Sequence, residues 1–328
     1  MAGYNEIRGL RVKYLSADPS NAEDGQVWYN STTGNLRVEG IVVAGSWASG
    51  GTFPDSRRAG FSAGTQTASF YAGGYTAGTL TTTKIYNGSS WASGPTFNES
   101  KFLGACSGIS TAAIASGGNG PGGANLTSSA TFNGSSWTAT SAVPVGNQGG
   151  SGFGILAASV TVGGSGDRDY SAEWNGSSWT AGNNCNVERY GAGGSGTQTA
   201  GLAAGGSNPG GSAKGTSSSY DGTNWTAGAS LLESKTDMYG GSSLASAGTS
   251  GTLISGGNND SGVTANCQIF NGTAFVTTAS LASARYGNQT GDSTSALLTA
   301  GYNASNANTN AVEEFTGPVV ITKTISVS

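Results

Sequence analysis

The chain is patterned as short apolar runs that recur with a regular period. Each run alternates apolar residues with small or polar ones and ends in a doublet of small residues. The doublets stand at Gly73-Gly74, Gly117-Gly118, Gly163-Gly164, Gly205-Gly206, Gly256-Gly257 and Ala300-Gly301. Successive doublets are 44, 46, 42, 51 and 44 residues apart. The pattern therefore predicts six copies of one structural unit of about 45 residues.

A second signature lies between the doublets and predicts a tight hairpin. Its copies are Asn87-Gly-Ser-Ser-Trp91, Asn133-Gly-Ser-Ser-Trp137, Asn175-Gly-Ser-Ser-Trp179, Asp221-Gly-Thr-Asn-Trp225 and Asn271-Gly-Thr-Ala-Phe275, with a degenerate Ala44-Gly-Ser-Trp47. Asn-Gly and Asp-Gly suit turns that need a positive φ at both central residues. A further turn is expected at 63–67 and again at 195–199, before the run that ends in the doublet. Each unit therefore reads as four short antiparallel strands, and no long helical period is present.

Four strands in 40–50 residues are typical of one blade of a β-propeller. The Gly doublet, the following aromatic residue and the Trp resemble kelch repeats over about residues 41–316. We therefore expect an all-β, kelch-like propeller of six blades, with the Trp side chains packed between blades. The sixth unit has no following Trp, so 46–49 (Ser-Trp-Ala-Ser) should supply its outer strand and close the ring. Seven blades remain an alternative if 41–47 and 319–327 form an extra sheet.

The spacing between signatures distinguishes the two faces of the expected propeller, because the loops on one face have a constant length and those on the other vary in length. The turn Gly and the doublet are 8 or 9 residues apart, whereas the distance from doublet to Trp or Phe varies from 16 to 20. The variable loops include 75–81, 119–126 and 207–215, which predicts a binding surface on that face. Tyr75 and Tyr302 each follow a doublet directly and are candidate ligand-binding residues.

A cation recurs ten residues after most of the Trp or Phe residues. The positions are Arg57, Lys101, Asn147, Arg189, Lys235 and Arg285, with Lys235 in a unit that carries an insertion. We expect this position to begin the innermost strand, so that the cations rim the central channel and attract an anionic sugar or phosphate. The alternative is local pairing with Asp55, Glu99, Glu188 and Glu233 on a solvated rim, which contributes little.

The amino-acid composition excludes several kinds of catalytic and binding site. The chain has no His among 328 residues, which excludes Ser-His-Asp catalysis and His-ligated metals and haem. Charged residues make up 10% and the net charge is −4, so no basic patch of the nucleic-acid-binding kind is expected. Cys106, Cys185 and Cys267 read as buried small hydrophobes. The Asp and Asn side chains of 167–169 and 258–260 could offer oxygens to Ca²⁺, but residues of these types are common in turns, which explains them better. We expect no enzyme, no cofactor and no metal site.

Residues 1–40 do not share the repeat. The stretch 25–38 reads as a hairpin with a Thr-Gly turn, preceded by extended 10–15. No apolar signal segment and no membrane-spanning run is present. A hairpin of this size cannot bury a core alone, so it should dock on the propeller or on a partner. Trp28 and Tyr29 are the candidate attachment residues, and the expected division is 1–40 as attachment segment and 41–328 as propeller.

The chain resembles kelch-like virion proteins of marine tailed phages in three features. These are the N-terminal segment 1–40 (the head), the repeated TQTA…AGG and NGSSW motifs, and the C-terminal segment from Glu313 to Ser328 (the tail). This resemblance spans nearly the whole chain. It implies a non-enzymatic fibre or decoration subunit of a virion that contacts other virion proteins through residues 1–40. It also implies that the loop face contacts a host-surface glycan or receptor, with a homo-oligomer as one form of assembly. The alternative is a purely structural connector between virion subunits.

Overall fold

The structure is a computed structural model that describes residues 12–20, 26–165, 169–208, 210–238 and 250–325. The chain divides into two compact units. The propeller unit comprises Ser46–Gly317, and the terminal unit comprises Met1–Gly45 with Pro318–Ser328. The only helical element among the described residues is the 3₁₀ turn η2 (Pro121–Gly123). None of the described helices is long and apolar enough to cross a membrane.

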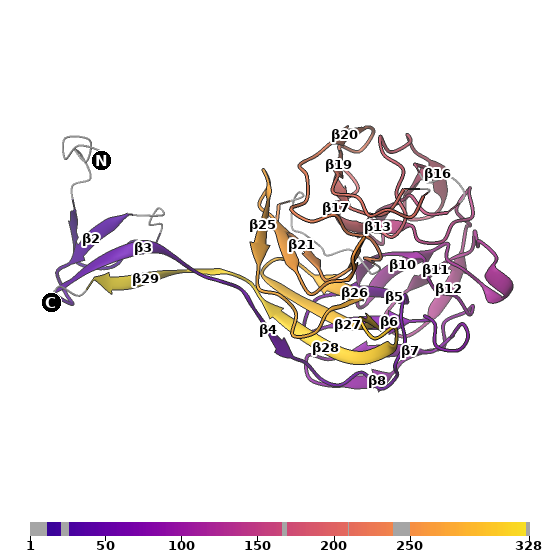
Figure 1. Ribbon diagram of the computed structural model, residues 1–328, viewed down its shortest axis with the longest axis horizontal. Helices are drawn as coiled ribbons and strands as arrows, with labels where there is room; N and C mark the ends of the chain where they lie inside the picture. Colours follow the sequence, from indigo (N-terminus) through magenta and orange to yellow (C-terminus); the bar gives the residue numbers. More distant parts are fainter. Residues whose placement is uncertain (1–11, 21–25, 166–168, 209, 239–249, 326–328) are drawn as a thin grey trace. The chain divides into compact units, whose positions relative to one another are not determined.

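In the part of the chain that the structure describes, the propeller unit contains six successive antiparallel blade sheets and one two-stranded ribbon (Figure 1). Blade 1 is β5 (Phe61–Gly64), β6 (Ser69–Ala72), β7 (Thr83–Tyr86) and β8 (Trp91–Ser93). Blade 2 is β9 (Ala105–Ile109), β10 (Ala112–Ser116), β11 (Ser129–Phe132) and β12 (Trp137–Thr140). Blade 3 is β13 (Ser151–Ile155), β14 (Ala158–Val162), β15 (Ser171–Trp174) and β16 (Trp179–Ala181). Blade 4 is β17 (Gly193–Thr197), β18 (Ala200–Ala204), β19 (Ser217–Tyr220) and β20 (Trp225–Ala227).

Blades 5 and 6 depart from this plan. Blade 5 has β21 (Thr252–Ser255), β24 (Cys267–Phe270) and β25 (Phe275–Thr278), with the small ribbon β22 (Asn258–Asn259) and β23 (Gly262–Val263) between them. The innermost strand expected before the turn at Gly248 falls outside the described residues. Blade 6 is β26 (Arg285–Gly291), β27 (Ser295–Asn303) and β28 (Asn308–Thr316), completed by β4 (Ser46–Ser49).

Strand β4 closes the ring as the sequence predicts. It pairs antiparallel with β28, from Thr316 opposite Ser46 to Glu313 opposite Ser49. The innermost strands contact one another in order from β5 through β9, β13 and β17, and β26 returns to β5. The fold is therefore a kelch-like β-propeller with six blades.

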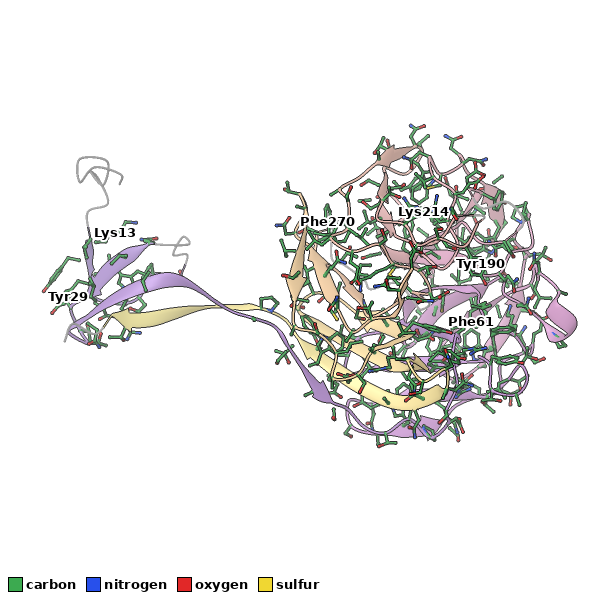
Figure 2. The ribbon with its side chains drawn as sticks, viewed as in Figure 1. Lys13, Tyr29, Phe61, Tyr190, Lys214 and Phe270 are labelled. Carbon is green, nitrogen blue, oxygen red and sulfur yellow. The ribbon has the colours of Figure 1, made fainter. Side chains whose placement is uncertain are left out.

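The Trp residues pack between blades, which confirms their expected role. Trp225 of blade 4 is 8% exposed and shares a core cluster with Phe153 of blade 3. Its ring lies 6.0 Å from the Phe153 ring in an edge-on arrangement. Trp47 of β4 donates from Nε1 to the carbonyl of Ala279, which belongs to blade 5. Each blade therefore gains a buried aromatic contact from its neighbour, and Phe61 on β5 and Phe270 on β24 add to these cores (Figure 2).

The glycine doublets join the blades through the main chain. The second residue of each doublet donates its N–H to the carbonyl of the residue at the repeated cation position in the next blade. These bonds run Gly74→Lys101, Gly118→Asn147, Gly164→Arg189, Gly206→Lys235, Gly257→Arg285 and Gly301→Arg57, at 2.6–3.1 Å. The last one crosses the closure, so the hydrogen bonds form a complete ring. At Gly163, φ is +74° and an added Cβ would lie 2.4 Å from the carbonyl oxygen of Arg189, which explains the glycine.

The terminal unit is one small sheet in the order β1-β2-β3-β29. Its strands are β1 (Lys13–Leu15), β2 (Val27–Asn30), β3 (Asn35–Val43) and β29 (Val319–Ile325). The predicted hairpin is confirmed, with Val27 opposite Val38 and Asn30 opposite Asn35. The predicted boundary at residue 40 differs from the structure, because β3 continues to Val43 and pairs with β29. Residues 41–45 and 318–328 therefore belong to this unit and not to a seventh blade.

Candidate functional site

The repeated cations do not form an exposed rim. Arg57, Lys101 and Lys235 are 0% exposed, and Arg189 and Arg285 are 1% exposed. Asn147 at the same position is 2% exposed. The prediction that these side chains attract an anion from the channel is therefore wrong, because a surface ligand cannot reach them. Arg285 begins β26 as expected, but Arg57, Lys101, Asn147 and Arg189 each stand four residues before the innermost strand of their blade. The offset of ten residues also does not reveal that the side chain turns into the blade.

The buried cations hold the strands of their own blade together. Arg57 donates to the carbonyl of Gly73 at 2.9 Å and to Thr82. Arg189 donates in the same way to the carbonyls of Gly205 at 2.6 Å and Thr216 at 2.9 Å. Asn147 donates from Nδ2 to the carbonyl of Gly163 at 3.1 Å. Arg57 and Arg189 thus satisfy carbonyls where the second strand ends and where the third begins, which a buried backbone requires.

Carboxylates accompany most of these cations. Arg57 pairs with Asp55 at 3.3 Å, Lys101 with Glu99 at 3.6 Å and Lys235 with Glu233 at 3.4 Å, as the local-pairing alternative expects. Arg285 pairs instead with the buried Glu313 of β28. Among the described residues, no ion pair joins Arg189 to Glu188. The pairs differ from the expected solvated rim, since their cations are buried.

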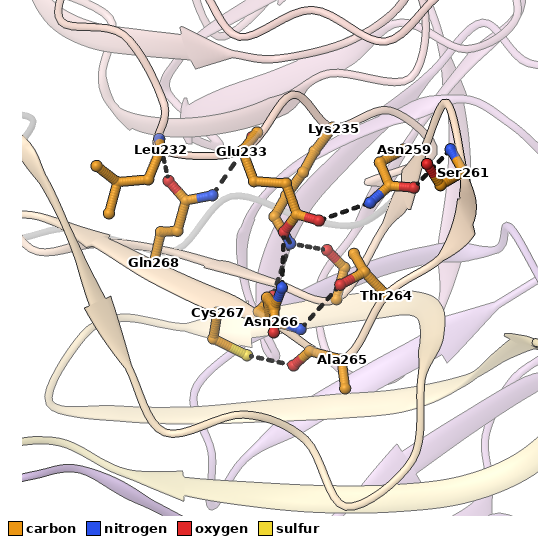
Figure 3. A network of polar contacts seen from close by, with 11 residues as sticks. Leu232, Glu233, Lys235, Asn259, Ser261, Thr264, Ala265, Asn266, Cys267 and Gln268 are labelled. Atoms are coloured by element: carbon orange, nitrogen blue, oxygen red, sulfur yellow. Dashed lines mark hydrogen bonds and ion pairs between the residues drawn. The ribbon is translucent and has the colours of Figure 1, made fainter.

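The surroundings of Lys235 show how such a cation is held (Figure 3). Its Nζ donates to the carbonyls of Gly256 at 2.7 Å and Asn266 at 2.6 Å. Glu233 beside it accepts hydrogen bonds from the side chains of Asn259 at 2.6 Å and Asn266 at 3.1 Å. Burial lowers the pKa of Lys235, and the Glu233 carboxylate opposes that shift. This network is structural, because its polar groups are engaged with one another.

The residue directly after each buried cation forms a different set. These residues are Arg58, Phe102, Gln148, Tyr190, Thr236 and Tyr286. All but Thr236 are half-buried, and Tyr190 lies near the middle of the propeller unit in Figure 2. They bridge to the residues that follow the doublets, as Arg58 does to Tyr75 and Phe102 to Asn119. Side chains alternate along a strand, so a shift of one residue moves from the blade interior to the loop face.

Three of these side chains and two tyrosines that follow doublets form a continuous ladder across blades 6, 1 and 2. The Tyr286 and Tyr302 rings stack at 5.5 Å between centroids. The Arg58 guanidinium carbon lies 4.4 Å from the Tyr302 ring centroid and 5.4 Å from that of Tyr75. Tyr75 then contacts Phe102 at 4.9 Å. The structure thus brings the predicted residues Tyr75 and Tyr302 together through Arg58, which the sequence analysis did not single out.

Two cavities flank this ladder. The first, here the Asp237 cavity, has a volume of about 450 Å³ and is lined by Asp237, Asn258, Tyr286, Tyr302 and Asn306, among others. The second, here the Arg58 cavity, has about 610 Å³ and is lined by Arg58, Tyr75, Phe102, Asn119 and 120–123, among others. Both open among the variable loops that follow the second strands. The predicted binding face therefore carries two concave sites separated by the ladder.

Electrostatics differ between the two cavities. In the part of the chain that the structure describes, no carboxylate lies within ion-pair distance of Arg58. The Asp237 carboxylate, by contrast, accepts a hydrogen bond from Asn258 Nδ2 at 3.2 Å. Burial raises the pKa of Tyr286, with the Arg58 charge opposing and the Asp237 charge adding to that shift. The phenol therefore remains a neutral hydrogen-bonding group between a cation and an anion.

The candidate attachment residues divide between the core and the surface of the terminal unit. Trp28 is 0% exposed and its Nε1 donates to Asp18 Oδ1 at 2.9 Å, so it is not a contact residue as predicted. Alternation along β2 buries Trp28 and Asn30 and turns Tyr29 outward. Tyr29 stacks with Tyr14 at 5.1 Å, and Tyr14 is 75% exposed. The accessible aromatic surface is thus the Tyr14–Tyr29 pair.

No group of three or more His, Cys, Asp or Glu side chains within the described ranges is arranged to hold a metal ion. Asp260 instead accepts from the backbone N–H of Ala213 at 2.8 Å. Residues 167 and 168 of the other oxygen-bearing turn lie outside the described part. Cys106, Cys185 and Cys267 are buried free thiols, as expected.

Comparison with known proteins supports the fold. No protein-family model matches the chain, and no curated protein matches it. A solved structure titled "Structure of YjhT" is similar, with a TM-score of 0.64 and 14% sequence identity. The match covers 82% of this chain and 99% of that one. At this identity the likeness establishes the kelch-like propeller architecture alone.

Proposed function

We propose that the chain is a non-enzymatic structural protein of a virion, a fibre or decoration subunit, whose propeller loop face binds a glycan on the host surface. The observation that carries this proposal is the Tyr286–Tyr302–Arg58–Tyr75–Phe102 ladder between two cavities. The virion setting rests on the resemblance of the head, repeat and tail sequences to kelch-like phage proteins.

The chemistry of the loop face suits a sugar. A sugar ring presents C–H groups on its faces and hydroxyls around its edge. Aromatic rings such as Tyr302 and Tyr75 offer flat apolar surfaces with polar tips for the former. Asp237, Asn258 and Asn119 offer carboxylate and amide groups for the latter. Few charged groups and several aromatic ones in a concave site are typical of small-ligand recognition.

The terminal unit supplies the proposed attachment to the particle. It brings both ends of the described chain into one sheet through β3 and β29. Its stacked aromatic pair, the exposed Tyr14 and the half-buried Tyr29, gives a partner protein an apolar contact with hydroxyl groups at the edge.

Two variants separate the proposed roles. We expect Tyr302→Ala to lower glycan binding on a glycan array by about tenfold or more, since one aromatic contact contributes that much. It should leave incorporation into particles unchanged. Tyr14→Ala is the matched control, a Tyr removed from the other unit, and we expect it to reduce incorporation without affecting glycan binding.

Truncation to Ser46–Gly317 tests the attachment role further, because this segment retains β4 and therefore the closed ring. We expect a folded propeller that is absent from particles. Incorporation of this truncated protein would contradict attachment through the terminal unit. A particle map with the loop face covered by a neighbouring subunit would favour a structural connector instead of a receptor-binding protein.

A further inference from the structure

We propose that the ligand of the loop face is an acidic oligosaccharide that places a neutral sugar in the Asp237 cavity and a carboxylate-bearing sugar in the Arg58 cavity. The inference rests on the proposed glycan-binding function and specifies the chemistry of its two subsites.

The surroundings of Arg58 favour the binding of an anion. Its guanidinium contacts the rings of Tyr302 and Tyr75, and contacts to ring faces do not use its N–H donors. Within the described residues, the Arg58 side chain has neither an ion pair nor a hydrogen bond to a protein acceptor. It is half-buried, so its charge acts in a partly desolvated setting. A guanidinium in such a place binds a carboxylate with two parallel hydrogen bonds.

Arg57 next to it shows the contrast. Arg57 is fully buried, donates to Gly73 and Thr82, and pairs with Asp55. The protein thus supplies hydrogen-bond acceptors and a carboxylate for Arg57, whereas Arg58 lines a cavity. The contacts that stabilise the inside of the blade therefore do not explain why a charged residue stands at position 58.

Asp237 makes the other cavity favour a neutral sugar over an acidic one. A carboxylate accepts hydrogen bonds from sugar hydroxyls and repels a second carboxylate. Asn258 Nδ2 holds the Asp237 carboxylate at 3.2 Å, and Tyr286 and Tyr302 provide the flat wall beside it. The neutral sugar of the pair therefore belongs in this cavity.

The backbone does not require a carboxylate at this position. Asp237 has a φ of +62°, and the equivalent residues Ala59, Leu103, Gly149 and Gly191 also have positive φ values, between +54° and +71°. Of the six equivalent residues, which include Gly287, only Asp237 is acidic. Asp tolerates the left-handed conformation, so the blade places a charged group where its neighbours carry uncharged ones.

The two cavities lie on either side of the contact between Arg58 and Tyr302, so one ligand that crosses this contact could occupy both. Tyr302 lines the Asp237 cavity and contacts Arg58, and Arg58 lines the second cavity together with Tyr75. Adjacent sugars of one chain would then lie on either side of the Arg58–Tyr302 contact. This arrangement selects a repeating unit that alternates a neutral and an acidic sugar.

The test uses an array of uronate-containing oligosaccharides, each printed beside its carboxyl-reduced form. We expect the full-length chain to bind the acidic form about tenfold tighter or more, as a charge-assisted pair provides. Arg58→Gln should abolish this preference and retain binding of the carboxyl-reduced form. Asp237→Asn should weaken both forms and keep the preference. Lys84→Gln, which removes a cation from β7 that donates to Ser93, is the matched control and should change binding by less than about twofold.

Equal binding of acidic and carboxyl-reduced forms would overturn this inference and leave the proposed glycan binding intact. A preference for the acidic form that persists in Arg58→Gln would also overturn it, because the carboxylate would then bind elsewhere. Absence of binding to every glycan on the array would overturn the inference and the glycan-binding function together.

Discussion

Arg57 and Arg58 are adjacent in the sequence and occupy opposite environments. Arg57 is 0% exposed, donates to Gly73 and Thr82, and belongs to the ring of buried side chains that repeats in every blade. Arg58 is half-buried in the aromatic ladder of the loop face, between Tyr302 and Tyr75. The comparison teaches that the repeat keeps the first position inside the blade, whereas the second lines the loop-face cavity where we propose that the ligand binds.

The largest expected effect concerns the aromatic residues of the two regions. Trp225→Ala should lower the free energy of unfolding by about 3–5 kcal/mol, because it empties the core between blades 3 and 4. Tyr302→Ala in the ladder should cost about 1 kcal/mol, since its ring is half-buried and faces a cavity. Urea unfolding of both variants measures the difference. Similar losses would mean that the ladder belongs to the framework.

The next effect compares the cations directly. Arg189→Met should lower the free energy of unfolding by about 3 kcal/mol, because the carbonyl of Gly205 and the hydroxyl of Ser218 lose a buried donor. Arg58→Gln should change it by less than about 1 kcal/mol, as is usual for surface substitutions. Denaturant midpoints at equal slope report both values. A large loss in Arg58→Gln would contradict its assignment to recognition.

A pair of glycines tests the ring of main-chain bonds. Gly163→Ala should cost about 2–3 kcal/mol, because it combines a left-handed φ of +74° with a Cβ 2.4 Å from the Arg189 carbonyl oxygen. Gly122→Ala has a similar φ of +78° and nothing within 4 Å, so it should cost about 1 kcal/mol. Thermal or urea unfolding distinguishes them. Equal costs would show that backbone strain alone explains the doublets.

The smallest effect is a pH dependence of the buried ring. Burial lowers the pKa of Lys101 from 10.5 to about 8, and Glu99 only partly offsets this shift. Between these values the unfolded chain binds more protons than the folded one, so the free energy of unfolding rises with pH. The rise should begin near pH 8. Burial raises the pKa of Cys106 from 9.0 to about 12, which lowers stability above pH 9 and limits the useful window to pH 8–9.

The measurement compares the wild type with Lys101→Met by urea unfolding at pH 7.5, 8, 8.5 and 9. We expect the stability of the wild type to increase relative to the variant over this range. A difference that stays constant with pH would mean that Lys101 is not desolvated in the folded protein.

Much of the fold follows from local pattern. The doublets, the Asn-Gly turns and the Trp residues recur with the period of a blade, and the missing sixth Trp correctly predicts that Ser46–Ser49 closes the ring. Tyr75 and Tyr302 were correctly placed on the loop face because they follow the doublets. No sequence signal singles out Arg58, Phe102 and Tyr286, although each stands directly after a residue of the repeated cation position.

The errors have a common physical cause. A period locates a residue along a strand, but the alternation of side chains means that an error of one position exchanges the interior for the surface. Arg57 and Arg58 differ in this way, and so do Trp28 and Tyr29. The charge of Arg57 suggested an exposed site, whereas burial with carbonyl acceptors and Asp55 stabilises it inside the blade.

The sequence by itself determined a β-propeller of repeated blades, its closure by 46–49 and its inter-blade aromatic packing, because these depend on local turns and repeated apolar positions. The pairing of β29 with β3 then excluded the seventh blade that the sequence left open. Only the tertiary structure decided that the repeated cations are buried, that β29 pairs with β3, and that Arg58 joins Tyr302 to Tyr75. These features depend on contacts between residues far apart in the chain, such as Arg58 and Tyr302, which are separated by 244 positions. No local pattern encodes such pairings.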